Sequence, residues 1–399
     1  MAPGNAGTTS FAENVQIDVN EFSKISAFIV QKKIDLIVVG PEDPLVGGLR
    51  DYLETKEEHK NLKIIGPAKE GAKLEGSKDF SKDFMDRHSI PTAGARTFDS
   101  ENYKQAIEYL KTRNLPIVLK ADGLAAGKGV IIATTYKEAE ENLEDMLLNQ
   151  RFGAASKKVL IEDFLEGIEV SVFVLTDGKD YIVLPEAKDY KRIGEHDTGP
   201  NTGGMGAVSP VPFADKTFMQ KVTKQIIIPT IKGLQKDGIP YIGFLFLGLI
   251  KVKNEPFVIE YNVRMGDPET QAVLPRIKGD FLDLLIAAAD QKLDDFKIEI
   301  DPKCAATVVM ASKGYPGKYE KGKKIWGLAT SPKSKVFHAG TIIDEEYVLT
   351  NGGRVLAVTG MGTNMKEALT NAYTGVEEIS WEGVQFRKDI GKDLLSLES

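Results

Sequence analysis

The chain has 399 residues, 42% of them hydrophobic, and this length is typical of a globular protein with two or three domains. Its 58 acidic and 51 basic residues give a formal net charge of −7, which argues against a nucleic-acid-binding surface and favours small-molecule chemistry. The single cysteine, Cys304, lies in the apolar run CAATVVM and predicts a buried, unreactive thiol.

Nothing in the sequence predicts export or membrane insertion. The stretch MAPGNAGTTS has neither a basic n-region nor an apolar h-region. The longest apolar run, YIGFLFLGLI, is shorter than a membrane span requires. Together with the lone cysteine, these features predict a cytoplasmic protein with no membrane partner.

The first part of the chain predicts a parallel α/β unit. Two short apolar runs, IDLIVVG (34–40) and LKIIG (62–66), do not alternate with polar residues, and each ends at glycine after a helix-like segment. The next segment, GSKDFSKDFMDRHSIP, predicts a helix that Ser77 caps and that ends before Pro91.

From Pro116 onward the pattern changes to paired strands. The runs PIVLKAD and GVIIATT flank a glycine-rich loop, and the segments 169–185 and 244–262 predict two hairpins. Another strand-rich block follows Asp301. No low-complexity linker separates these blocks, so we expect three compact units in contact, of mixed α/β and α+β class.

The glycine-rich loop KADGLAAGKGV (120–130) predicts a phosphate-binding element, because glycine lets the backbone approach a phosphate and lysine supplies the opposite charge. It is not a Walker A loop, since Gly129 rather than Ser or Thr follows Lys128. It is not a Rossmann fingerprint either, since a strand rather than a helix follows it. Two readings remain: a flap that folds over a triphosphate, or a flexible hairpin without a ligand.

The segment VIEYNVRMGDPETQ (258–271) suggests a metal site. Alternation along a strand places Glu260, Asn262 and Arg264 on one face and Ile259 on the other. A carboxylate beside an amide oxygen suits a hard divalent cation. A solvated strand face is the alternative, although the acidic turn GDPET directly after it favours a site.

The segment 188–210, KDYKRIGEHDTGPNTGGMGAVSP, contains five glycines and two prolines. We expect it to be a long loop without regular structure, which in a compact domain is usually functional or disordered. Glycine pairs bring the backbone against a ligand, but a surface loop with ordinary turn chemistry is the alternative.

Taken together, the motifs LEGSKDFSKDF, KADGLAAGKGV, DTGPNTGGMGA and GDPETQ resemble the phosphoribosylamine–glycine ligase family of ATP-grasp enzymes in purine synthesis. The likeness extends from APGNAGT at Ala2 to FRKDIG at Phe386. It implies an ATP-grasp fold with an N-terminal parallel α/β domain (1–72), an ATP-grasp domain (73–296) whose mobile lid covers about 93–163, and a C-terminal strand-rich domain (297–399).

The resemblance also implies which residues hold the nucleotide and the metal. Two lysines would hold the phosphates, the glycine loop would close over them, and the remaining residues would contact adenine and ribose. These nucleotide-binding positions are Lys78, Lys120, Gly127, Lys128, Gly129, Glu162, Phe164, Leu165 and Glu169. The implied ligands of Mg²⁺ or Mn²⁺ are Glu260 and Asn262.

The implied reaction is the ATP-dependent joining of glycine to 5-phosphoribosylamine through glycyl phosphate. Such chemistry needs charge neutralisation rather than a protein nucleophile. The resemblance gives catalytic roles to Arg264 and Asp267, and it implies that the substrates are bordered by Asp189, Lys191, Asn201, Thr202, Gly203, Gly204 and Arg264. A monomer or weak homo-oligomer without a nucleic-acid partner is expected.

The sequence departs from the family at its beginning. Members of the family start with a strand, a GGREHA loop and a helix ahead of APGNAG, whereas here Met1 directly precedes Ala2. We expect that the recorded start is shortened or misplaced; a reduced protein with weak substrate capture is the alternative. Asp163 and Tyr190 stand where other members often have Glu and His.

Two other functions remain open from the sequence. The chain could be another ATP-grasp ligase acting on a different carboxylate, or an ATP-binding protein with weak or no catalysis. The C-terminal block predicts a packing domain that completes the cleft, with NGGRVL (351–356) as a turn entering a strand. The four histidines show no metal-ligand spacing, and His338 is expected to be structural.

Overall fold

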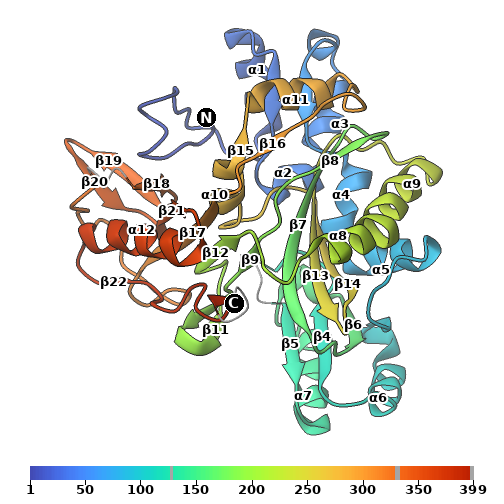
Figure 1. Ribbon diagram of the computed structural model, residues 1–399. Helices are drawn as coiled ribbons and strands as arrows, with labels where there is room; N and C mark the ends of the chain where they lie inside the picture. The colour runs from blue at the N-terminus through green and yellow to red at the C-terminus, as the bar shows by residue number, and fades with distance from the viewer. Residues whose placement is uncertain (126–128, 329–332, 396–399) are drawn as a thin grey trace.

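The computed structural model describes residues 1–125, 129–328 and 333–395. Figure 1 shows a central region of strands and helices, a small unit with α6 and α7 at its lower end, and a C-terminal sheet covered by α12 at its side. In the described part of the chain, no helix is both long and apolar enough to span a lipid bilayer.

The N-terminal segment has the predicted parallel pair. Strands β1 (Leu36–Val38) and β2 (Lys63–Ile65) run parallel, and the fully buried Leu45 and Leu53 belong to the same apolar cluster as Ile64 of β2. The neighbouring helices are α1 (Phe22–Lys32), α2 (Glu42–Gly47), α3 (Leu49–Glu54) and the 3₁₀ turn η1 (Glu57–His59).

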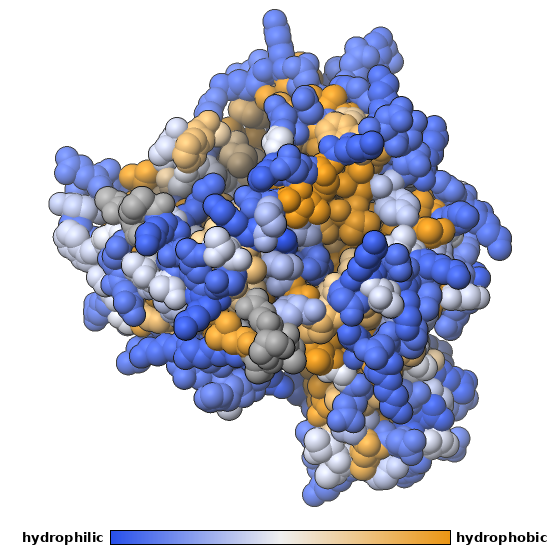
Figure 2. All heavy atoms as spheres, viewed as in Figure 1, coloured by the Kyte–Doolittle hydropathy of each residue, from blue (hydrophilic) through white to orange (hydrophobic). Residues whose placement is uncertain are grey.

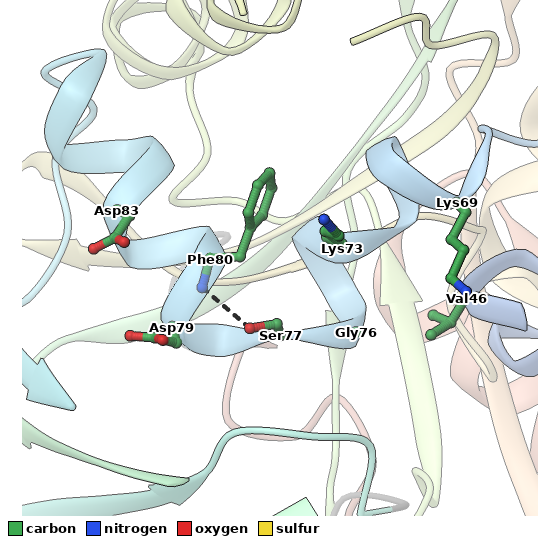
Figure 3. Close-up of a pocket in the computed structure, with 8 residues that line it drawn as sticks. All are labelled: Val46, Lys69, Lys73, Gly76, Ser77, Asp79, Phe80 and Asp83. Atoms are coloured by element: carbon green, nitrogen blue, oxygen red, sulfur yellow. Dashed lines mark hydrogen bonds between the residues drawn. The ribbon is translucent and has the colours of Figure 1, made fainter. Parts of the chain in front are cut away.

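Two consecutive helices, α4 (Lys69–Gly76) and α5 (Lys78–Arg87), lead from this segment toward the cleft. The predicted cap is confirmed: the Ser77 hydroxyl accepts a hydrogen bond from the Phe80 amide at 3.1 Å (Figure 3). Phe84 on α5 is fully buried and meets the Tyr261 ring edge-on, with centroids 6.5 Å apart. The helix pair is therefore fixed against strand β14 (Glu255–Asn262).

The residues of the expected lid form a unit with its own sheet and core. Its antiparallel strands lie in the order β3 (Ala95–Asp99), β6 (Lys158–Asp163), β4 (Ile117–Ala121) and β5 (Val130–Ala133), so the predicted strand–loop–strand is confirmed. A separate apolar cluster includes Leu110, Leu119 and Leu143. The helical segments are η2 (Ser100–Asn102), α6 (Tyr103–Lys111), α7 (Tyr136–Leu147) and η3 (Gly153–Ser156).

The central sheet contains both predicted hairpins. Its strands lie in the order β14, β13 (Gly243–Val252), β7 (Ile168–Thr176) and β8 (Tyr181–Val183), and every pair is antiparallel. The surrounding elements are α8 (Lys216–Val222), the π-helix η5 (Thr223–Ile227), α9 (Ile228–Lys236), α10 (Thr270–Val273), η6 (Leu274–Arg276), β15 (Ile277–Lys278), α11 (Phe281–Ala289) and β16 (Glu299–Ile300).

The C-terminal sheet takes two of its strands from the segment 188–210. Its order is β18 (Ser334–His338), β21 (Arg354–Gly362), β17 (Cys304–Ser312), β12 (Gly206–Ser209) and β9 (Lys188–Asp189), and β22 (Val384–Gln385) also pairs with β17. Helix α12 (Met365–Glu378) packs on β21 and β17, and β19 (Thr341–Asp344) pairs with β20 (Tyr347–Thr350).

Our expectation of a structureless loop over 188–210 is therefore wrong. Besides β9 and β12, this segment contains β10 (Arg192–Gly194), the turn η4 (Glu195–Asp197) and β11 (Thr198–Asn201). Glycine does not prevent pairing here, because the fully buried strand β17 supplies backbone partners to β12. The predicted buried cysteine is confirmed, with Cys304 only 7% exposed on β17.

Candidate functional site

A cluster of lysines lies where α5 meets the lid sheet. Lys82 on α5 and Lys120 on β4 each form an ion pair with one carboxylate oxygen of Glu162, whose side chain is 3% exposed on β6. Lys120 Nζ also donates to the Ile259 carbonyl at 3.2 Å, which ties the lid sheet to β14. The expected adenine neighbour Glu162 thus lies between two lysines.

A third lysine, Lys78, begins α5 beside the same cluster. Its Nζ lies 3.4 Å from the carbonyl oxygen of Asp122 and 3.3 Å from that of Gly123, at the entrance to the glycine loop. Burial lowers the pKa of Lys78 and of Lys82. Lys82 and Lys120 share one buried carboxylate, and this leaves an excess of positive charge that favours an anion beside them.

The glycine loop continues from this cluster. Gly127 and Lys128 lie outside the described residues. Gly129 is described, and its carbonyl accepts from the Ala121 amide at 2.8 Å as β5 begins. A Cβ at Gly129 would lie 2.8 Å from that of Ala125, so the two arms of the loop approach closely because this position has no side chain.

The end of β14 carries the predicted Glu260–Asn262 pair. Glu260 is half-buried and Asn262 is 9% exposed. A β-bulge interrupts the pairing of β14 with β13 at Ile259, because Gly248 pairs with Glu260 and the next residue, Leu249, pairs with Val258. The bulge interrupts the two-residue period on which the expected alternation depends.

Arg264 follows this strand, and its guanidinium contacts oxygen atoms of several residues. Its guanidinium donates to Asn262 Oδ1 at 3.3 Å and to Glu75 Oε1 at 2.8 Å. Glu42 on α2 lies 3.4 Å from Arg264 Nε. The predicted proximity of Asn262 and Arg264 is therefore present in the structure.

A second group of charges lies on β7, β9 and the segment after β14. Lys191 forms an ion pair with Glu169 at 2.6 Å and lies 3.8 Å from Asp189. Burial alone would lower the pKa of Lys191, but Asp189 and Glu169 hold it well above its ordinary value. Burial raises the pKa of Asp189 and raises that of Glu269 to about 8. Here carboxylates outnumber cations.

The expected substrate residues 201–204 lie between these groups and the C-terminal sheet. The Thr202 hydroxyl donates to the Lys191 carbonyl at 2.7 Å and accepts from the Gly204 amide at 2.9 Å. Gly204 has φ +113°, and a Cβ there would lie 2.4 Å from Pro268. Glycine is thus required where this turn meets the GDPET segment. Asn201 ends β11, opposite Arg192.

The residues expected around adenine follow β6. Phe164 is 39% exposed and Leu165 is half-buried directly after the strand ends at Asp163. An exposed aromatic ring beside a lysine cluster offers a stacking surface. Figure 2 shows hydrophobic surface in the hollow in the middle of the visible face.

Sequence reasoning missed three charged residues that hold this site together. Lys82 lies one helical turn beyond Lys78 in the same motif, so its spacing was a usable signal. Glu75 and Arg354 had none, because their partners lie far along the chain. Arg354 at the start of β21 donates to Asp267 Oδ2 and to the Gly203 carbonyl, both at 2.7 Å. The turn NGGRVL enters a strand as predicted, yet it also reaches the site.

A separate hollow of about 440 Å³ lies along α4 and α5 (Figure 3). Its lining residues are Val46, Lys69, Lys73, Gly76, Ser77, Asp79, Phe80 and Asp83. None of the residues predicted to bind nucleotide, metal or substrate is among them. This hollow is therefore distinct from the region where the predicted site residues gather.

Comparison with known proteins first defines the class. A family model described as phosphoribosylglycinamide synthetase, ATP-grasp (A) domain, matches residues 76–270. The fold is similar to the biotin carboxylase domain of 2-oxoglutarate carboxylase from Hydrogenobacter thermophilus, with a TM-score of 0.73, 18% identity and coverage of 100% of this chain and 86% of that one. The chain is an ATP-grasp protein.

The particular family follows from the remaining matches. The N and C domain models of phosphoribosylglycinamide synthetase match residues 1–75 and 305–393. Phosphoribosylamine–glycine ligases from Vibrio parahaemolyticus and Escherichia coli are 45% and 47% identical, over 100% and 98% of this chain and 92% and 91% of their own lengths. The ligase structure from Thermotoga maritima gives a TM-score of 0.84 at 34% identity, covering 97% of this chain and 92% of that one. The chain belongs to the phosphoribosylamine–glycine ligase family.

Proposed function

We propose that the chain joins glycine to 5-phosphoribosylamine at the expense of ATP, giving glycinamide ribonucleotide, ADP and phosphate. Family membership supports this reaction. The structural observation that carries it is a lysine cluster beside a carboxylate–amide pair in one cleft, bridged by the contact of Lys120 with the Ile259 carbonyl. That arrangement suits a triphosphate and a divalent cation lying side by side.

In this proposal the lysines hold the nucleotide phosphates. Lys78 and Lys120 contact the triphosphate, Lys82 and Glu162 fix the position of Lys120, and the loop of Gly127, Lys128 and Gly129 closes over the phosphates. Phe164 and Leu165, with Glu162 behind them, border adenine. Glu169 accepts hydrogen bonds from the ribose. A closed loop would exclude water from the acyl phosphate.

Glu260 and Asn262 are the proposed ligands of Mg²⁺ or Mn²⁺. They fit such an ion, because a carboxylate and an amide oxygen are hard donors on one strand end. Within the described residues, no hydrogen bond or ion pair engages the Glu260 carboxylate, so it is available as a ligand. A bound ion would neutralise charge on the transferring phosphoryl group.

Arg264 and Asp267 are proposed to act on the reacting groups. A carboxylate oxygen of glycine attacks the γ-phosphorus and ADP leaves, giving glycyl phosphate. The amine of phosphoribosylamine then attacks the carbonyl carbon, the C–O bond to phosphate breaks, and the amine loses a proton. The guanidinium would stabilise the developing oxyanion. The proposed substrate contacts are Asp189, Lys191, Asn201, Thr202, Gly203, Gly204 and Arg264.

The proposal includes the organisation of the chain. We divide it into 1–72, 73–296 with a lid at about 93–163, and 297–399, although β9 and β12 of the middle unit belong to the C-terminal sheet. A monomer or weak homo-oligomer in the cytoplasm, without nucleic acid as a partner, agrees with the net charge of −7.

Phosphate release from ATP tests the proposed function. Release that requires glycine and phosphoribosylamine together, in a fixed ratio to glycinamide ribonucleotide formed, is the expected result. Release with a different carboxylate in place of glycine, or nucleotide binding without release, would overturn the assignment.

A further inference from the structure

Glu75 is a buried carboxylate that none of the predicted functions uses. It lies in the last turn of α4, just before Gly76 and Ser77, and its side chain is only 6% exposed. Its two partners lie 188 and 189 positions further along the chain, in the segment that follows β14. One carboxylate therefore joins the N-terminal helices to the proposed catalytic strand end.

The two oxygens of Glu75 have different partners. Oε2 accepts from the Val263 amide at 2.8 Å, and Oε1 accepts from Arg264 Nη2 at 2.8 Å. The same Nη2 donates to Asn262 Oδ1 at 3.3 Å. The carboxylate thus fixes the backbone directly after Asn262 and, through Arg264, the amide oxygen proposed as a metal ligand.

The other carboxylate beside Arg264 is less suited to this task. Glu42 is 35% exposed and lies 3.4 Å from Nε, whereas the Glu75 contact is shorter and nearly excluded from solvent. Hydrogen bonds that involve a charged group are stronger than neutral ones, and their contribution is greatest away from water. Glu75 rather than Glu42 therefore determines the direction of the guanidinium.

We propose that Glu75 is a positioning residue for the ligation step, acting through Arg264 and the Val263 amide rather than by touching a substrate. This inference rests on the proposed function. Glu75 holds the guanidinium and the Asn262 oxygen in the orientation that the transition state requires. The alternative is a purely structural tie between α4 and β14.

The location of Glu75 makes the two roles separable. Three residues further along, Lys78 lies at the entrance to the glycine loop, with its Nζ near the carbonyl oxygens of Asp122 and Gly123. A loosened α4–α5 junction would disturb Lys78 as well and weaken nucleotide binding. Loss of orientation at Arg264 alone would lower turnover and leave nucleotide affinity unchanged.

The test compares Glu75→Gln with Glu70→Gln, an exposed position on the same helix. For Glu75→Gln we expect kcat to fall roughly 10- to 100-fold, as for residues that orient catalytic groups. The affinity for a non-hydrolysable ATP analogue should stay within about twofold, and Glu70→Gln should match the wild type. If Glu75→Gln does not fold, Glu75→Asp withdraws the same charge by one methylene and is measured instead.

A double variant identifies the path of the effect. If Glu75 acts through Arg264, the change Glu75→Gln should lower kcat much less in the Arg264→Lys background than in the wild-type background. Unchanged kcat in folded Glu75→Gln, or losses of kcat and nucleotide affinity in parallel, would overturn the inference. A different result would overturn the proposed function: a wild-type protein whose phosphate release from ATP does not depend on glycine and phosphoribosylamine together.

Discussion

The two ends of the cleft carry opposite charge imbalances. At one end, Lys82 and Lys120 share the buried carboxylate Glu162, and Lys78 lies close to Lys120. At the other end, Glu169, Asp189 and Glu269 lie around Lys191, and Glu260 lies between the two ends, where it acts on both Lys78 and Lys191.

The difference shows how a single cleft can hold both an anion and a cation. Burial lowers the pKa of Lys78 at the first end and raises that of Asp189 at the second, so each end disfavours its own excess charge. A bound triphosphate would relieve the first imbalance, and a divalent ion or a substrate ammonium would relieve the second. The contact between Lys120 and the Ile259 carbonyl joins the two ends.

Glu260→Gln should break the comparison most severely. The variant keeps an oxygen ligand but loses the negative charge that would hold the metal ion. Because such an ion stabilises the transition state by several kcal/mol, we expect turnover at a limiting metal concentration to fall on the order of 1000-fold. Turnover titrated with Mg²⁺ measures this. Glu255→Gln, at the exposed start of the same strand, is the control. Wild-type metal dependence in the Glu260 variant would refute the ligand assignment.

Lys120→Ala tests the end of the cleft that has an excess of positive charge. The variant removes one of the two lysines on Glu162 and one proposed phosphate contact. We expect ATP affinity to fall roughly 100-fold, as for the loss of a charge-assisted hydrogen bond in a desolvated site. Calorimetric titration measures it, with Lys137→Ala on the exposed face of α7 as the control. Equal affinities in the two variants would contradict the role of Lys120.

Arg354→Ala refines the comparison of the two ends of the cleft. It removes contacts between the C-terminal sheet and the cleft but leaves the charged residues of both ends in place. Loss of its contacts to Asp267 and Gly203 should lower kcat/KM for glycine roughly tenfold, because misplaced groups react more slowly. ATP affinity should not change. Arg151→Ala on the lid is the control. A fall in ATP affinity instead would show that Arg354 acts elsewhere.

Glu269→Gln should have the smallest effect, on stability rather than catalysis. Burial raises the pKa of Glu269 from 4.5 to about 8, so the folded state binds this proton more tightly than the unfolded state does. Its stabilising contribution is present at low pH and declines as the pH rises from about 5 to 8. Between pH 5 and pH 8, roughly, the free energy of unfolding should therefore fall less in the variant than in the wild type. Urea denaturation of both proteins at the two pH values measures this difference. Equal losses would contradict the raised pKa.

Local features of the fold could be predicted from the sequence, because their causes lie within a few residues. The Ser77 cap, the two hairpins and the closeness of Asn262 to Arg264 depend only on neighbouring residues. The bulge at Ile259 was not predictable, because it depends on how β13 registers against β14.

The contacts that join the units were also beyond local reasoning. Glu75 meets Arg264 across 189 positions, and Arg354 meets Asp267 across 87. Of the strands in 188–210, β12 pairs with β17, nearly a hundred positions later, and β9 pairs with β12. A composition rich in glycine gave no sign of this pairing, since the signal lay in another part of the chain.

A crystal structure with Mn²⁺ and a non-hydrolysable ATP analogue tests the central claim most directly. We expect anomalous density for Mn²⁺ within bonding distance of Glu260 and Asn262, with the triphosphate against Lys78 and Lys120. A triphosphate bound elsewhere, or manganese beside the nucleotide but away from both residues, would contradict the account.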